Sequence, residues 1–126
     1  MTFIKEFITI FESANDGGTC YIDAYHYFMD NHSKDKKLKL VHTLVDGQGP
    51  LEGIRYNHAF LISGNTVIDP SQPKKKKFPK DLYYSIGNIN TKNKDYFEYT
   101  FDEFIEKVNK FKTYGPWEKI LLNNMY

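Results

Sequence analysis

The chain has 126 residues, and 17 Lys and Arg against 16 Asp and Glu give it a formal net charge of +1 at pH 7. This length fits one domain with a single core. The near-zero charge argues against a general role in binding nucleic acid or membrane surfaces. A single cysteine excludes an internal disulfide framework and a cysteine-cluster metal site. Ten Tyr and ten Phe indicate a core built largely from aromatic side chains.

Several other classes of protein are disfavoured by the motifs that the sequence lacks. No stretch is apolar enough to span a bilayer, and the first residues do not resemble a signal peptide, so we expect a cytoplasmic protein. His26, His32 and His42 lack the spacing of metal ligands. No phosphate-binding glycine loop is present. We therefore expect neither a metal nor a cofactor.

Two helices are predicted at the start of the chain. The first covers residues 2–13, where apolar side chains recur at spacings of three and four: Phe3, Ile4, Phe7, Ile8 and Phe11. The second begins at Cys20, after a turn with two glycines at residues 16–19, and continues to about Asn31.

Cys20 is the first candidate functional residue. At the N-terminus of a helix, free backbone N–H groups and the helix dipole favour thiolate over thiol, which makes a cysteine a better nucleophile. The alternative is that Cys20 is a small buried apolar residue, as most single cysteines are.

Downstream, residues 38–45 are predicted to form a strand, and residues 46–50 a turn-rich loop. A β-hairpin follows, with strands over residues 54–63 and 66–71 and a type II′ turn at Gly64 and Asn65. This turn pairs Ser63 with Thr66, Ile62 with Val67, and Leu61 with Ile68.

The same register places His58 and Asp69 on one face of the hairpin as diagonal neighbours, with backbones about 7–8 Å apart. Pro70 ends the second strand, because proline has no N–H to donate, and leaves Asp69 at the strand end. Cys20, His58 and Asp69 would then form a nucleophile, a base and a group that orients the base. The alternatives are a buried histidine bonded to a backbone carbonyl and an aspartate that only ends a strand.

These segments resemble a known family. Thr19-Cys20 at the start of a helix, Asn57-His58-Ala59-Phe60 in a strand and Val67-Ile68-Asp69-Pro70-Ser71 after it are similar to the core of transglutaminase-like proteins, within the papain-like cysteine enzymes. The resemblance covers about residues 15–71. Phe60 stands where the family often has Trp, and the segment between Cys20 and His58 is short. The resemblance implies an α+β papain-like fold and a Cys-His-Asp triad.

Other residues are candidates for the oxyanion site and the cleft. The backbone N–H of Cys20 would be one oxyanion donor, and Gln48 or Asn57 could supply a second from a side chain. Both residue types also occur in turns for purely structural reasons. Tyr56 and Trp117 are candidates for the cleft wall, although Trp117 is more typical of a core residue beside a terminal helix.

The rest of the chain is predicted to complete a sheet and add helices. Lys74–Lys77 and Lys80 favour a solvated loop over a phosphate-binding or acidic-partner site. Strands are predicted over residues 82–86 and 96–99, which gives an antiparallel sheet of about five strands. A helix over residues 101–112 follows a capping box of Thr100 and Glu103, and a short helix starts at Pro116 and runs through Leu122.

The sequence therefore predicts a single papain-like α+β domain over residues 1–126, with the Cys20 helix packed on an antiparallel sheet. Its expected function is hydrolysis of an amide or peptide, or acyl transfer, through a thioester at Cys20. The expected partner is a peptide or amide-bearing substrate, most simply a protein, and not a nucleic acid or a membrane. The alternative is a non-catalytic protein-binding module on the same fold. Substrate and oligomeric state stay open.

Overall fold

The computed structural model describes residues 19–47 and 51–124, so the predicted helix over residues 2–13 and the candidate Gln48 lie outside the described residues. The described chain forms a five-stranded antiparallel sheet in the order β4-β3-β2-β1-β5. The strands are β1 (Lys39–Asp46), β2 (Arg55–Ser63), β3 (Thr66–Ile68), β4 (Lys77–Pro79) and β5 (Phe97–Tyr99). The helices are α2 (Cys20–Asn31), α3 (Lys80–Ile86), α4 (Phe101–Phe111) and α5 (Lys119–Leu122). The predicted α+β class and five-stranded antiparallel sheet are confirmed.

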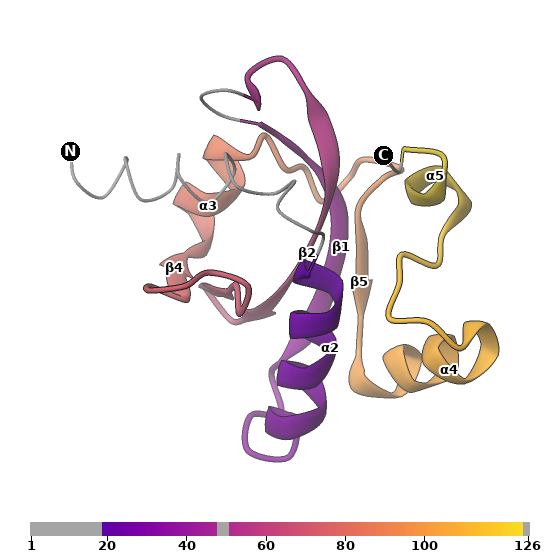
Figure 1. Cartoon of the computed structure of the whole chain (residues 1–126). Helices are drawn as coiled ribbons and strands as arrows, with labels where there is room; N and C mark the ends of the chain where they lie inside the picture. The colour runs from indigo at the N-terminus through magenta and orange to yellow at the C-terminus, as the bar shows by residue number, and fades with distance from the viewer. Residues whose placement is uncertain (1–18, 48–50, 125–126) are drawn as a thin grey trace.

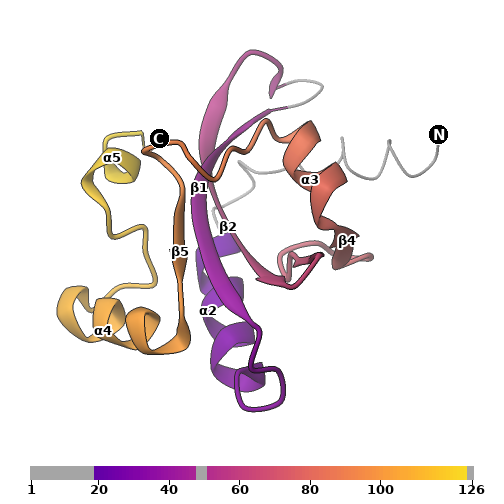
Figure 2. The same ribbon diagram turned by 180° about the vertical axis from the view of Figure 1, so that it is seen from behind.

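Helices cover both faces of the sheet, and α3 lies on the opposite side from α4 and α5 (Figure 1, and from behind in Figure 2). Alternate residues of the strands pack into two cores. The core on the side of α3 includes Val41, Val45, Tyr56, Phe60, Ile62, Val67 and Tyr83. The core on the side of α2 and α4 includes Leu40, Ala59, Leu61, Ile68, Phe28 and Phe104. Because neighbouring residues of β2 face opposite cores, the position of a residue in the strand decides which helix its side chain meets.

The hairpin of β2 and β3 has the predicted register. Ser63 pairs with Thr66, Ile62 with Val67, and Leu61 with Ile68. Gly64 adopts φ 59°, as the first central residue of a type II′ turn requires. The face shared by His58 and Asp69 follows directly from this register.

Two predicted helices are also confirmed. Helix α2 begins at Cys20 and ends at Asn31. Helix α4 begins after Thr100, whose hydroxyl accepts a hydrogen bond from the Glu103 N–H at 3.3 Å, while the Glu103 carboxylate accepts one from the Thr100 N–H at 2.9 Å. This capping box satisfies two backbone donors that a helix start leaves open.

The predicted strand over residues 82–86 is wrong, because this segment belongs to helix α3. Its tyrosines favour strands, but Pro79 directly before the helix and Asp81 in its first turn favour a helix start. Tertiary packing decides the outcome, since Tyr83 and Tyr84 both enter the α3-side core. The fifth strand is instead β4, which begins at Lys77, at the end of the lysine run.

The last predicted helix is shorter than expected. Helix α5 begins at Lys119, so Pro116 lies before it and not at its first position. The buried Trp117 donates from its indole N–H to the Thr113 carbonyl at 3.0 Å, which holds the preceding residues in a turn. Within residues 19–47 and 51–124, no helix has the length and apolar character needed to cross a membrane.

Candidate active site

The structure brings together the three residues of the predicted triad. Cys20 opens α2, His58 lies within β2, and Asp69 directly follows β3. His58 Nε2 lies 2.9 Å from Asp69 Oδ2, and the side chain of Cys20 lies close enough to His58 to raise its pKa. His58 faces the α3 side of the sheet, whereas Cys20 belongs to the α2-side core. The contact between them therefore crosses from one face to the other, close to the point where the β2–β3 pairing ends at Leu61 and Ile68.

Asp69 is held by more groups than His58 alone. The Tyr83 hydroxyl donates to its Oδ2 at 2.7 Å, and the Ser71 hydroxyl donates to its Oδ1 at 2.6 Å. The Gln72 amide N–H lies 3.4 Å from Oδ2. Charge-assisted bonds of this kind are about twice as strong as neutral ones. Asp69 is therefore a fixed carboxylate and not simply the end of a strand.

The neighbours of Nε2 determine which ring nitrogen of His58 carries the proton in the neutral form. The Tyr83 hydroxyl donates its one hydrogen bond to Asp69. Its oxygen, which lies 2.9 Å from His58 Nε2, can therefore only accept from the ring. The Asp69 carboxylate also only accepts. Two acceptors at Nε2 require the proton on that nitrogen, so in the neutral ring the lone pair is on Nδ1.

Electrostatics in the site are strong because the groups are shielded from water. His58 is 2 % exposed, Asp69 is 0 % exposed and Cys20 is 8 % exposed. Burial alone would lower the pKa of His58, but the charge of Asp69 and the hydrogen bonds to Asp69 and Cys20 raise it to about 10. Burial would raise the pKa of Asp69, but His58, Ser71 and Tyr83 hold it below its ordinary value. The two residues therefore form a buried ion pair of imidazolium and carboxylate.

Three of the remaining candidates lie within the described residues, and only one is near the triad. Tyr56 is on the same face of β2 as His58, with ring centroids 6.4 Å apart, and the charge of Asp69 contributes to raising its pKa. Asn57 lies on the opposite face and donates to the Leu121 carbonyl at 2.8 Å. Trp117 packs in the α2-side core against the ring of His42. Of the three, Tyr56 alone therefore lies on the same face of β2 as His58.

Two residues of the site were missed from the sequence. Ser71 follows Asp69 by two positions, a spacing at which a hydroxyl and a carboxylate often bond within a turn, so a local signal existed. Tyr83 gives no such signal, because its local sequence favours a strand. Only the packing of α3 brings its hydroxyl to Asp69, which is 14 residues away in the chain.

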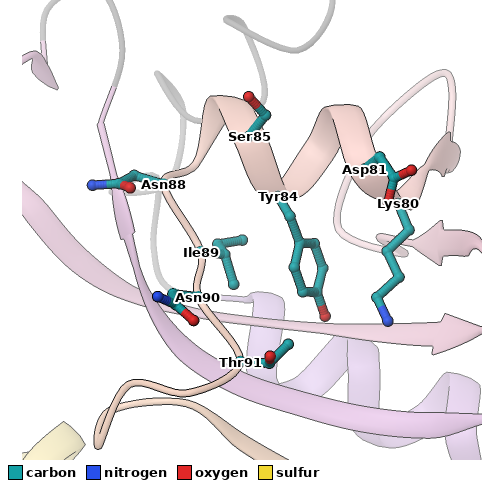
Figure 3. Close-up of a pocket in the computed structure, with 8 residues that line it drawn as sticks. All are labelled: Lys80, Asp81, Tyr84, Ser85, Asn88, Ile89, Asn90 and Thr91. Atoms are coloured by element: carbon teal, nitrogen blue, oxygen red, sulfur yellow. The ribbon is translucent and has the colours of Figure 1, made fainter.

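A separate hollow of about 560 Å³ lies over α3 and the segment that follows it (Figure 3). Its lining mixes polar and apolar side chains and includes no member of the triad: Lys80, Asp81, Tyr84, Ser85, Asn88, Ile89, Asn90 and Thr91. Elsewhere in the described parts of the chain, no group of three or more His, Cys, Asp or Glu could hold a metal ion.

Comparisons of the chain with models of protein families, with curated proteins and with solved structures found no match. The case for a function therefore depends on the geometry and electrostatics of the site itself.

Proposed function

We propose that this protein is a papain-like cysteine enzyme, with a core similar to that of transglutaminase-like proteins, that cleaves an amide through a thioester at Cys20. One observation carries the proposal: His58 binds Asp69 through Nε2, and the side chain of Cys20 lies close enough to the same imidazole to raise its pKa. A base held in this way is the arrangement that activates a thiol for nucleophilic attack.

The reaction would proceed in two halves. Because His58 is protonated in the resting site, Cys20 attacks as the thiolate whose proton His58 already holds, and its sulfur forms a C–S bond with the carbonyl carbon. His58 then gives the proton to the leaving nitrogen as the C–N bond breaks. Water attacks the thioester with His58 as the base, and the C–S bond breaks. The acid is released, which leaves the Cys20 thiolate beside the protonated His58. Asp69 stabilises the imidazolium in both halves and stays ionised throughout.

The substrate we expect is a peptide or another amide-bearing molecule. The backbone N–H of Cys20, at the start of α2, is available as one oxyanion donor, because the first N–H groups of a helix have no partner within it.

The test is the reactivity of Cys20 in the wild type and in His58→Gln, from about pH 5 to pH 9. Glutamine keeps an amide donor for Asp69 but cannot hold the thiol proton as a positive charge beside Cys20. Iodoacetamide alkylation measures reactivity, and ultraviolet thiolate absorbance relative to Cys20→Ala measures ionisation even where the reagent enters slowly. His26→Ala is the matched control, because His26 is exposed on the same helix as Cys20.

We expect fast alkylation that persists below neutral pH in the wild type and in His26→Ala, and its loss in His58→Gln. An ordinary thiol in all three proteins would overturn the proposal and favour a non-catalytic binding protein. A reactive thiol then justifies a screen of amide substrates, with Cys20→Ala as the inactive control.

A further inference from the structure

Tyr83 contacts both partners of the ion pair, and the mechanism above gives it no part. It lies in α3, its exposed fraction is 0 %, and its hydroxyl is 2.7 Å from Asp69 Oδ2 and 2.9 Å from His58 Nε2. Three polar atoms from β2, the segment after β3 and α3 therefore meet at one buried point.

We propose that Tyr83 is a positioning residue whose hydroxyl fixes the orientation of the His58 ring and keeps Asp69 ionised. The hydroxyl is both a hydrogen-bond donor and a hydrogen-bond acceptor. It donates to the carboxylate, and its oxygen accepts from the Nε2–H of His58. The inference rests on the proposed function, since what Tyr83 positions is the base for Cys20.

Packing explains the ring of Tyr83 but not its hydroxyl. The ring lies 5.0 Å from that of Phe60 and 5.7 Å from that of Phe78, contacts that a phenylalanine would make equally well. A buried hydroxyl loses its bonds to water, and this loss is offset only where it finds partners. Two partners of this hydroxyl, His58 and Asp69, belong to the proposed triad, which indicates a role in the site.

The hydroxyl also has a suitable ionisation state. Burial and the charge of Asp69 raise the pKa of Tyr83 well above its ordinary value, so it stays a neutral donor. Without this donor, the fully buried Asp69 would take up a proton more readily as the pH falls. His58 would then lose the negative charge that stabilises its imidazolium. As the pH is lowered, Cys20 would therefore lose its reactivity at a higher pH than in the wild type.

The experiment is the pH profile of Cys20 alkylation in Tyr83→Phe, with Tyr84→Phe as the matched control. Tyr84 is the next residue of α3 and lines the hollow in Figure 3, and its hydroxyl bonds to that of Tyr96 at 2.6 Å. Both variants remove one buried phenol oxygen from the same helix. Only Tyr83→Phe removes it from the triad.

We expect the acid limb of the Tyr83→Phe profile to move upward by about one pH unit, which slows alkylation about tenfold on that limb. Tyr84→Phe should keep the wild-type profile. An unchanged profile in Tyr83→Phe would overturn the inference. If His58→Gln abolishes the reactivity while Tyr83→Phe leaves it unchanged, only the inference fails and the proposed function stands.

Thermal unfolding shows whether Tyr83→Phe is folded. If it is not, nuclear magnetic resonance of the wild type replaces it. A slowly exchanging Tyr83 hydroxyl proton with a nuclear Overhauser effect to the His58 Nε2–H is the expected result. A folded wild type in which neither proton is protected from exchange would reject the role of Tyr83.

Discussion

Asp69 accepts hydrogen bonds from His58, Tyr83 and Ser71, and its carboxylate is fully buried. Such a charge is stable in a protein interior only with partners that replace water. Because the site is shielded from water, the charge of the Asp69 carboxylate acts on His58 with little screening. The protonation of His58 is therefore the property most directly set by this one carboxylate.

We predict that Asp69→Asn lowers the pKa of His58 from about 10 by about three units. The amide of asparagine has no charge to stabilise the imidazolium. Burial, which lowers the pKa of His58, is then offset less than in the wild type. The measurement is a titration of the His58 ring by nuclear magnetic resonance.

Asp35→Asn is the control for this titration. The Asp35 carboxylate also accepts a hydrogen bond from a side chain of β2, from Ser63 at 2.6 Å, but that bond is at the end of the strand away from His58. It should leave the titration of His58 in place. If His58 titrates at the same pH in Asp69→Asn as in the wild type, Asp69 does not set its charge.

Among the elements, the hairpin was predictable from sequence because its information is local. Gly64 and Asn65 specify the turn, the turn specifies the register, and the register places His58 and Asp69 on one face. The start of α2 at Cys20 was predictable for a similar reason, from the turn residues before it.

Helix α3 was not predictable in this way. Residues 82–86 include two tyrosines, which favour strands, and the segment becomes a helix because it packs its aromatic face on β2 and β3. Since Tyr83 belongs to this helix, its place in the site was missed as well. The contact of Tyr83 with the site depends on packing between segments far apart in the chain, so the local sequence pattern does not predict it.

The capping box of α4 gives a test of stability at the level of one element. Thr100→Ala removes the hydroxyl that accepts from the Glu103 N–H, and we expect it to lower the free energy of unfolding by about 1 kcal/mol. Urea denaturation measures this change. Because the hydrogen bonds of the capping box join only Thr100 and Glu103, alkylation of Cys20 should stay at the wild-type rate.

Thr113→Ala is the matched control, because Thr113 is exposed and lies outside the helix. It should change the free energy of unfolding by less than about 0.5 kcal/mol. Equal stabilities for Thr100→Ala and the wild type would mean that the capping box adds nothing to the fold.

For the molecule as a whole, two buried histidines give the stability opposite dependences on pH. The pKa of His58 is raised to about 10, so its contribution is complete below about pH 6.5 and is lost as the pH rises through 10. Burial lowers the pKa of His42 to about 3. Below about pH 6.5 the unfolded chain therefore binds a proton at His42 and the folded chain does not, which lowers the stability as the pH falls. Stability should therefore be greatest near neutral pH.

His42 lies in an aromatic environment that explains its behaviour. Its ring centroid is 4.6 Å from that of Tyr21, 4.7 Å from that of Trp117 and 5.3 Å from that of Tyr99. Within the residues that the structure describes, neither ring nitrogen has a hydrogen-bond partner. No carboxylate offsets the burial of a charge there, so the imidazole stays neutral in the folded protein.

Between about pH 6 and pH 4.5, His58 is protonated and Asp69 ionised in both the folded and the unfolded chain, so neither changes the stability. His42 differs, and we predict that the wild type loses about 2 kcal/mol of unfolding free energy over this range. Urea denaturation at both pH values measures the loss in the wild type, in His42→Phe and in His42→Leu. Both variants should lack most of the loss whatever their absolute stability, because neither side chain binds a proton. If they lose as much as the wild type, another group takes up the proton and His42 is not what makes the fold sensitive to acid.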